Sequence, residues 1–387
     1  MALPAAPAPE HTLSVVTRRP VLDRTLRTVG FELVFHDRPG LPQSWPPEFV
    51  AGRHPAYVGV GPDLLFADEA LMLDPSCVVL ELSAGLPVDE RLIARVRELR
   101  AHGFRLVLSD AGGRSGSEPL LEFVDTVKLD VLRIGHHEAL CELRRLEGSG
   151  MRMLVEGVDS ADAFEVFRDA GFDLFQGLFY ERPHLDADTL PVGHGAALGA
   201  LCELQLHGGD FDALEQVIRR DVALSFRLLR YVNSAFIDLP RTVGSIREAL
   251  MLLGTRAVRQ WAVALVLTGL EARPHALLST ALVRARTCEL ILAPYDSEHA
   301  AQGFTAGLFS LLDAILGVPM LRILDDLPLS PAVAAAITDH EGVAGKALAK
   351  AIAFERGEVD SPTLAGHSRA ALTIAYNDAV RWADAIL

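Results

Sequence analysis

Cysteine is scarce in this 387-residue sequence, and the wide spacing of its cysteines argues against a protein held together by disulfides. The four cysteines lie far apart and form no Cys-x-x-Cys pair: Cys77, Cys141, Cys202 and Cys288. Without such a pair we expect buried, free thiols, as in proteins of the reducing cytoplasm.

Positive charge is also in short supply. The sequence has 36 Lys and Arg residues against 51 Asp and Glu residues, which gives a net charge of −15. Affinity for a nucleic-acid backbone depends on clustered Lys and Arg. The composition therefore argues against a nucleic-acid-linked regulator, and we expect no nucleic-acid partner.

Long hydrophobic runs are missing too. The most apolar segment, residues 261–270, is far shorter than the roughly 20 residues that cross a bilayer. Residues 1–11 are rich in Ala and Pro and lack the basic start and apolar stretch of a signal peptide, so they are predicted to be a disordered tail. We expect a cytoplasmic protein with no membrane partner.

The sequence does contain enough apolar residues for two cores, since they make up 50% of the chain. Over residues 12–190, short apolar runs alternate with helical stretches, which predicts an α/β domain with strands at 13–17, 31–35, 57–60, 78–82, 106–108, 127–129 and 153–155. Ser160 and Gly171 are typical of the start and end of one helix. Pro and Gly gather in residues 185–199, and beyond them apolar residues recur every three or four positions, which predicts an all-α domain over residues 196–387.

Acidic and amide residues follow several of the predicted strands, in the fragments GFEL, VVLELS, VLSDAGG, TVKLD, LVEGVD and FQG. Carboxylates at strand ends can converge on a divalent metal ion at the carboxyl-end mouth of a β/α barrel. The ordered series resembles the EAL domain, a phosphodiesterase family that hydrolyses cyclic di-GMP. The resemblance implies a shortened (β/α) barrel, in which Lys128 orients the attacking water, Gln176 lies near the end of the barrel, and the metal ligands are Glu32, Glu81, Asp110 and Glu156.

Three departures from the family pattern fall at positions that the chemistry needs. Gly59 stands where the resemblance implies an asparagine ligand, Ser109 replaces the first of two paired aspartates, and His36 replaces an arginine that clamps a phosphate. Two-metal hydrolysis requires both metal ions. The resemblance therefore implies vestigial catalytic residues and no required cofactor, with at most one weakly bound Mg²⁺ and at most weak binding of cyclic di-GMP.

The second half resembles the HDOD domain, a helical relative of the HD metal-dependent phosphohydrolases, in DVALSFRLLRYVNSAF and TVGSIREALMLLGTRAVRQWAVAL. HD enzymes use an adjacent His-Asp pair, and the matching place here holds Leu312-Asp313. The resemblance therefore implies a recognition domain. Its expected contact surface, toward the barrel or another signalling protein, comprises Asn233, Ser234, Gly254 and Thr255.

Three functional classes follow from these observations. The favoured one is a non-catalytic signalling adaptor that binds other signalling proteins and responds to cyclic di-GMP. The second is a weakly active, metal-dependent cyclic di-GMP phosphodiesterase, and the third is the nucleic-acid-linked regulator. The sequence does not determine whether the protein forms a homodimer.

Overall fold

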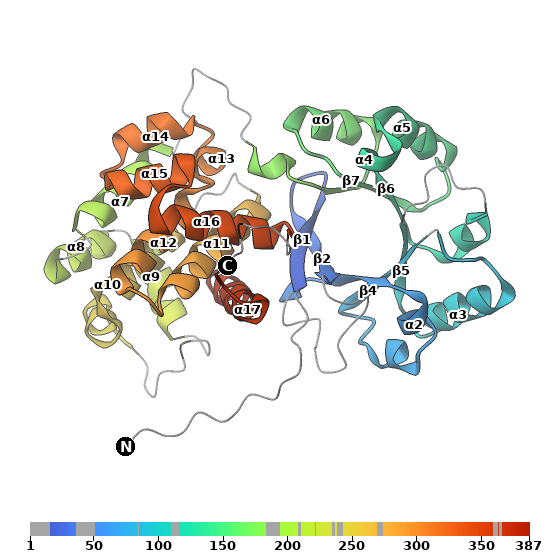
Figure 1. Cartoon of the computed structure of the whole chain (residues 1–387), viewed down its shortest axis with the longest axis horizontal. Coiled ribbons are helices and arrows are strands. Elements are labelled where there is room, and N and C mark those ends of the chain that lie inside the picture. The colour runs from blue at the N-terminus through green and yellow to red at the C-terminus, as the bar shows by residue number, and fades with distance from the viewer. Residues whose placement is uncertain are drawn as a thin grey trace.

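The computed structural model describes residues 16–35, 51–83, 85–109, 116–182, 194–207, 210–220, 222–233, 237, 243–268, 274–358, 363 and 366–387. The chain forms a β/α barrel and a helical domain that lie side by side (Figure 1). The predicted tail over residues 1–11 and residues 185–193 of the predicted boundary lie outside the described residues.

Eight strands close the barrel in chain order. β1 is antiparallel to both of its neighbours, β2 and β8, whereas the strands from β2 to β8 are parallel. Their bounds are β1 Val16–Asp23, β2 Thr28–Phe35, β3 Ala56–Val60, β4 Val78–Ser83, β5 Arg105–Ser109, β6 Thr126–Asp130, β7 Arg152–Glu156 and β8 Leu174–Gln176. The first predicted strand, 13–17, was placed too early, and β8 was not among the predicted strands.

A tight turn joins β1 to β2 without a helix. The Asp23 carboxylate accepts hydrogen bonds from the backbone N–H groups of Thr25 and Arg27 at 2.7 and 3.0 Å, which closes the turn. The shortened barrel is thus confirmed.

The remaining barrel connections carry mostly short helices. They are α2 Pro62–Leu65, η1 Asp68–Met72, α3 Glu90–Ala101, η2 Glu118–Phe123, α4 Val131–Ile134, α5 His136–Arg145, α6 Ala161–Ala170 and η3 Phe179–Glu181. At α6 the structure confirms both predicted ends, because Ser160 accepts a hydrogen bond from the Ala163 N–H and Gly171 has a left-handed φ of +119°.

The second domain is helical, as predicted. Its helices are α7 His194–His207, α8 Phe211–Arg220, α9 Val222–Val232, α10 Ile246–Thr268, α11 His275–Leu292, α12 Ser297–Phe309, α13 Leu312–Leu316, α14 Met320–Asp326, α15 Pro331–Asp339, α16 Gly342–Glu355 and α17 Arg369–Ile386. α11 is the central helix, and it packs on α12, α16 and α17. Most of its residues are buried.

Helix α10 contains the one described stretch, Ile246–Leu267, that is long and apolar enough to cross a membrane. Gly254 interrupts this helix with a non-helical φ of +82°. Within its most apolar window, 56% of the residues are buried inside the protein. This burial is what a core helix of the second domain requires.

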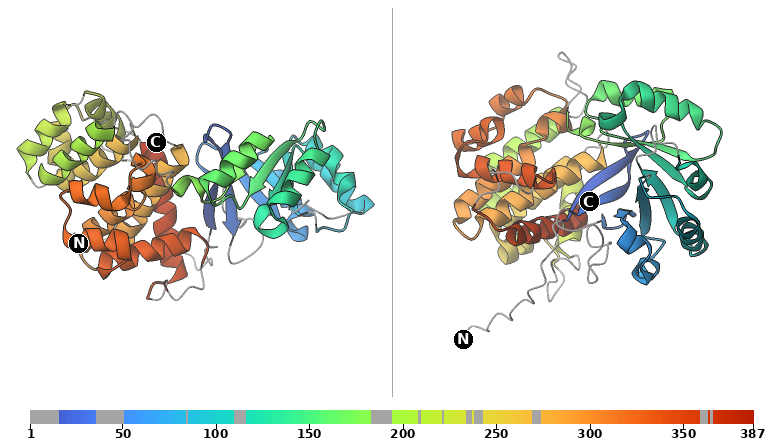
Figure 2. Two further views of the ribbon diagram at one scale, coloured as in Figure 1. Left: turned by 90° about the horizontal axis from the view of Figure 1, so that it is seen from above. Right: turned by 45° about the vertical axis from the view of Figure 1, so that its right-hand side comes forward.

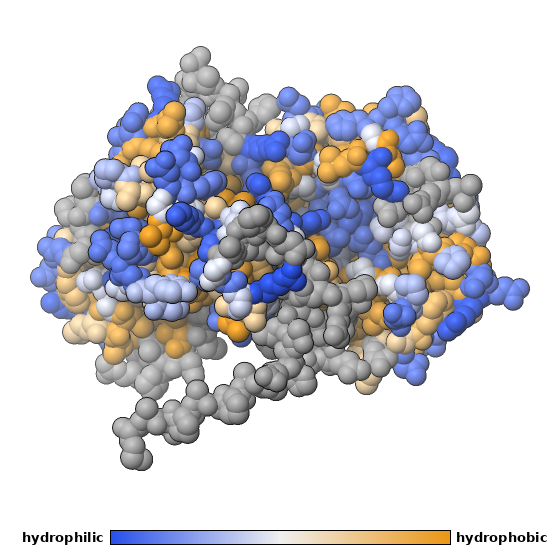
Figure 3. All heavy atoms as spheres, in the orientation of Figure 1, coloured by the Kyte–Doolittle hydropathy of each residue, from blue (hydrophilic) through white to orange (hydrophobic). Residues whose placement is uncertain are grey.

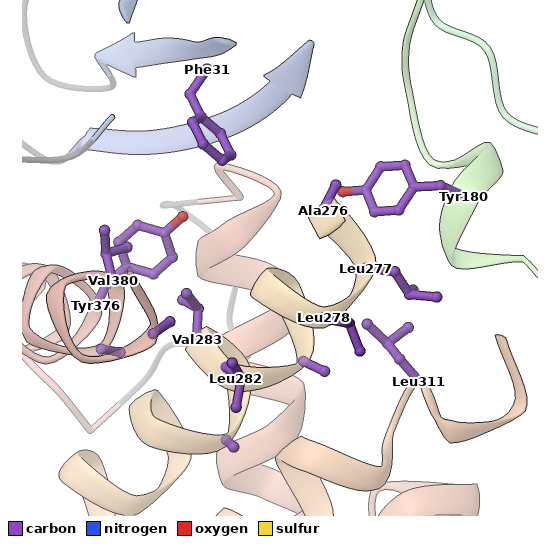
Figure 4. Packing of buried hydrophobic residues seen from close by; sticks show 14 of the residues in the cluster. Phe31, Tyr180, Ala276, Leu277, Leu278, Leu282, Val283, Leu311, Tyr376 and Val380 are labelled. Carbon is purple, nitrogen blue, oxygen red and sulfur yellow. The ribbon is translucent and has the colours of Figure 1, made fainter. Parts of the chain in front are cut away.

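The two domains meet where β1 and η3 of the barrel face α11, α16 and α17, and Figure 2 shows α17 beside the first strands. Arg18 of β1 bridges to Asp384 at 2.9 Å and donates to the Ser279 hydroxyl at 2.9 Å. Its guanidinium lies 4.3 Å from the centre of the Phe31 ring. Phe31 points from the barrel toward the packed side chains of the helical domain (Figure 4).

A buried ion-pair triad lies at the same junction. Arg284 of α11 lies 3.3 Å from Glu181 of the barrel and 3.1 Å from Glu355 of α16. Arg284 is only 3% exposed. A buried charge of this kind is stable only when it is paired, so the triad fixes how the domains dock.

Candidate functional site

A ring of side-chain positions lies at the carboxyl end of the barrel. A separate apolar cluster of Val21, Tyr57, Val79, Val107, Leu154 and Leu174 fills the barrel below it. Because side chains alternate along a strand, residues two positions from this cluster face the barrel interior as well. Six ring positions follow from this rule: Arg19, Gly59, Glu81, Ser109, Glu156 and Gln176. Glu32 of β2 and Lys128 of β6 complete the ring, because the Lys128 ammonium group lies 3.0 Å from Glu32 Oε1.

Lys128 lies at the centre of this ring. Its ammonium nitrogen is 3.0 Å from Glu32 Oε1, 3.2 Å from Glu81 Oε1 and 3.0 Å from Glu156 Oε2. The Gln176 amide donates to the second oxygen of Glu32 at 2.6 Å. The structure thus brings together five residues that the strand-end pattern singled out, and hydrophilic residues gather over the hollow of the barrel (Figure 3).

Arg19 is the ring residue that the sequence analysis missed. It pairs with Glu32 across the β1–β2 ladder, and its guanidinium lies 3.6 Å from Glu156 Oε1. The alternation of Arg19, Val21 and Asp23 along one strand was the signal that could have identified it.

Burial and charge act in opposite directions on the ring carboxylates. Burial, reinforced by the charges of Glu32 and Glu156, raises the pKa of Glu81 to about 7 against the pull of Lys128. Burial likewise raises the pKa of Glu156. At Glu32 the pKa is lowered, because Lys128, Arg19 and the Gln176 hydrogen bond together outweigh burial.

Lys128 stays charged in this environment. Burial alone would lower its pKa, but the three surrounding carboxylates outweigh burial and raise it. Lys128 therefore acts as an internal cation for the ring.

Two of the three departures fall on described ring positions. Gly59 is exposed, and a Cβ at this position would meet no atom within 4 Å. No neighbouring side chain among the described residues fills the space beside Gly59. The Ser109 hydroxyl donates to the Leu82 carbonyl at 3.2 Å. His36 and the predicted ligand Asp110 lie outside the described residues.

The described donors do not fit a metal ion in this arrangement. Within the described ranges, no three His, Cys, Asp or Glu side chains are placed to hold one ion together. Magnesium needs an octahedron of oxygen ligands, whereas Lys128 lies between the three glutamates here. A metal would have to displace the ammonium group.

The predicted contact residues of the helical domain have local roles where they are described. The Asn233 side chain bonds to Leu229 O, Val243 O and Val243 N, so it ties the end of α9 to the start of α10. Gly254 makes the break in α10, and Thr255 follows it. Ser234 lies outside the described residues.

The described barrel contacts of the second domain come mainly from α11 and α17. Side chains that bond to barrel residues include Ser279, Thr280, Arg284, Tyr376 and Asp384, on α11 and α17. Ser279 and Arg284 are buried among apolar residues of α11, so the local sequence does not distinguish them from core residues.

Comparison with known proteins gives two family matches. An EAL domain matches residues 64–183, and an HDOD domain matches residues 200–328. CdgJ of Vibrio cholerae serotype O1, named a cyclic di-GMP phosphodiesterase, is 29% identical over 371 residues, which cover 89% of this chain and 85% of that protein. YuxH of Bacillus subtilis, an uncharacterized protein, is 27% identical over 295 residues, which cover 74% of this chain and 72% of that protein.

Solved structures of EAL domains match part of this chain at low similarity. The EAL domain of Mycobacterium smegmatis DcpA is 20% identical, with a TM-score of 0.37, and the match covers 43% of this chain and 90% of that chain.

Proposed function

We propose that this chain, which joins an EAL domain to an HDOD domain, works in cyclic di-GMP signalling as a regulator that binds the nucleotide weakly and does not hydrolyse it. Its output would be contact with other signalling proteins through the docked pair of domains. The observation that carries the proposal is the composition of the ring, in which Gly59 supplies no side-chain ligand and Ser109 no carboxylate.

The chemistry of phosphodiester cleavage supports this choice. Two-metal hydrolysis holds two ions about 3.5–4 Å apart, so that both the attacking and the leaving oxygen are stabilised. The described part of the ring offers three glutamates, each within 3.2 Å of the Lys128 ammonium group. Lys128 already occupies the space between these glutamates, so a metal ion would have to displace its ammonium group.

Weak nucleotide binding follows from the same charges. Three carboxylates and one ammonium group leave the ring acidic, and an anionic dinucleotide is repelled from it. Arg19 offsets part of this charge from the β1 side. We therefore expect a dissociation constant above about 1 μM in EDTA, which corresponds to a binding free energy weaker than about −8 kcal/mol.

A second candidate is an active cyclic di-GMP phosphodiesterase. The Vibrio cholerae relative that bears this name aligns along 89% of this chain. The ring contains Glu32, Glu81, Lys128, Glu156 and Gln176. The two candidates therefore differ in how far Gly59 and Ser109 lower the rate of hydrolysis.

A cleavage assay separates the two candidates. Purified full-length protein is incubated with cyclic di-GMP in Mg²⁺ or Mn²⁺, and linear pGpG is quantified by chromatography. We expect no more product than in buffer. Metal-dependent pGpG formation that disappears in Glu32→Ala would establish the phosphodiesterase instead, and the variant also controls for a contaminating enzyme.

A further inference from the structure

A cleft of about 450 Å³ runs from the ring to the helical domain. On the barrel side it is lined by Arg19, Glu156 and Gln176 of the ring, and on the other side by Glu355 and Arg356 at the end of α16. Small-molecule sites usually enclose about 300–1,000 Å³. The cleft therefore has the size of a ligand site whose walls come from both domains.

The charged groups of the cleft differ in whether they are already paired. Glu355 and Glu181 share Arg284, and Arg19 lies beside Glu156. Arg356 is exposed and forms no salt bridge within the described part of the chain, and its charge acts on the neighbouring Glu355 carboxylate. Its guanidinium is a donor that an incoming anion can use without breaking an existing pair.

The position of Arg356 is fixed from behind. Both carboxylate oxygens of its neighbour, Glu355, accept hydrogen bonds from Arg284 at 3.1 Å. Arg284 also reaches Glu181, which lines the cleft from the barrel. The buried triad thus holds the end of α16 against the barrel mouth.

The cleft also offers an apolar surface. Leu132 is 77% exposed although it is a large hydrophobic residue, and it lines the cleft. An exposed leucine gains from contact with a flat apolar group such as a nucleobase. A ligand with a base and a phosphate would find a partner for each.

We propose that the helical domain forms one wall of the nucleotide site, and that Arg356 pairs with a phosphate of a cyclic dinucleotide that extends from the barrel mouth into the cleft. This inference rests on the proposed function, in which the barrel binds cyclic di-GMP. It assigns to the second domain a direct part in nucleotide recognition.

Calorimetric titration with cyclic di-GMP in EDTA tests the inference. The full-length chain is compared with Arg356→Ala, Arg356→Glu and the control Arg322→Glu. Arg322 is exposed on α14 and does not line the cleft, so its substitution changes the net charge equally. A charge-assisted hydrogen bond predicts that Arg356→Ala weakens binding about tenfold or more, and Arg356→Glu further.

Each result has one meaning. Weaker binding in both Arg356 variants, with Arg322→Glu within about twofold of the unchanged protein, supports the inference. Equal affinity in all four proteins overturns it but leaves nucleotide binding by the barrel intact. If the unchanged protein does not bind cyclic di-GMP even at millimolar concentration, the nucleotide binding in the proposed function is wrong. The inference about Arg356 is then wrong as well. Thermal melts of the variants show whether a loss of affinity reflects a loss of fold.

Discussion

Glu81 should make the stability of the barrel depend on pH. The ordinary pKa of a glutamate is 4.5, and burial among like charges raises that of Glu81 to about 7. The folded protein therefore holds a proton on Glu81 that the unfolded chain releases near pH 4.5. Folding takes up this proton between about pH 4.5 and 7, so the contribution of Glu81 to stability is lost as the pH rises through that window.

The size of the effect follows from the two pKa values. Between pH 5 and pH 8 the contribution of Glu81 to the free energy of unfolding falls by about 2–3 kcal/mol, since each pKa unit is worth about 1.4 kcal/mol. Glu81→Gln has a neutral amide that does not titrate. The variant should keep the stability that the unchanged protein loses over this range.

Hydrogen exchange of peptides that contain β4 measures this difference without assuming that both domains unfold together. The protection of β4 is compared in the unchanged protein and in Glu81→Gln at pH 5 and pH 8, after correction for intrinsic exchange rates. Glu138→Gln, on the exposed face of α5, is the control. Parallel changes in the unchanged protein and Glu81→Gln would show that Glu81 is ionised throughout and would refute the argument.

Two further predictions concern the buried cations. Lys128→Met should lower the unfolding free energy by about 3–5 kcal/mol, because three glutamates lose their buried partner. Millimolar Mn²⁺ should then raise the melting temperature of this variant, whereas a similar rise in the unchanged protein would contradict the role of Lys128 as an internal cation. Arg284→Met should lower the unfolding free energy by a similar amount, because Glu181 and Glu355 stay buried without their partner. Stability should be recovered when Glu181→Gln and Glu355→Gln are added to this variant. Urea unfolding curves that match the unchanged protein would exclude this role for the triad.

The strand ends were predictable because local sequence carries their pattern. In β4, β6 and β7 a short apolar run ends beside a charged residue, and strand alternation places that residue inside the barrel. The first strand was placed wrongly for a physical reason. Its sequence, VTRRPVLD, has two adjacent arginines, which break the alternation of apolar and polar residues expected of a half-buried strand. Arg18 is buried against the helical domain, while Arg19 faces the ring.

The domain junction was not predictable because its partners are far apart in sequence. Arg18 and Asp384 are separated by 366 positions, and Arg284 is 103 positions from Glu181. An arginine within the apolar helix α11 indicates a buried charge, but nothing local identifies the carboxylates that neutralise it. The side-chain hydrogen bonds of Asn233 are all made within its own domain, so its role in contact with another signalling protein stays a prediction.

The charge balance of the ring explains how its buried carboxylates are stabilised from within the protein. A cluster of buried carboxylates needs a cation, and a metal ion is one way to supply it. Here Lys128 contacts all three described glutamates of the ring from within the protein. Gly59 leaves open space and Ser109 satisfies its hydroxyl on a backbone carbonyl, so neither position leaves a buried polar group unpaired. Gly59 and Ser109 therefore cost the barrel little stability. Under the proposed function, the barrel is a docking and binding unit that does not hydrolyse the nucleotide.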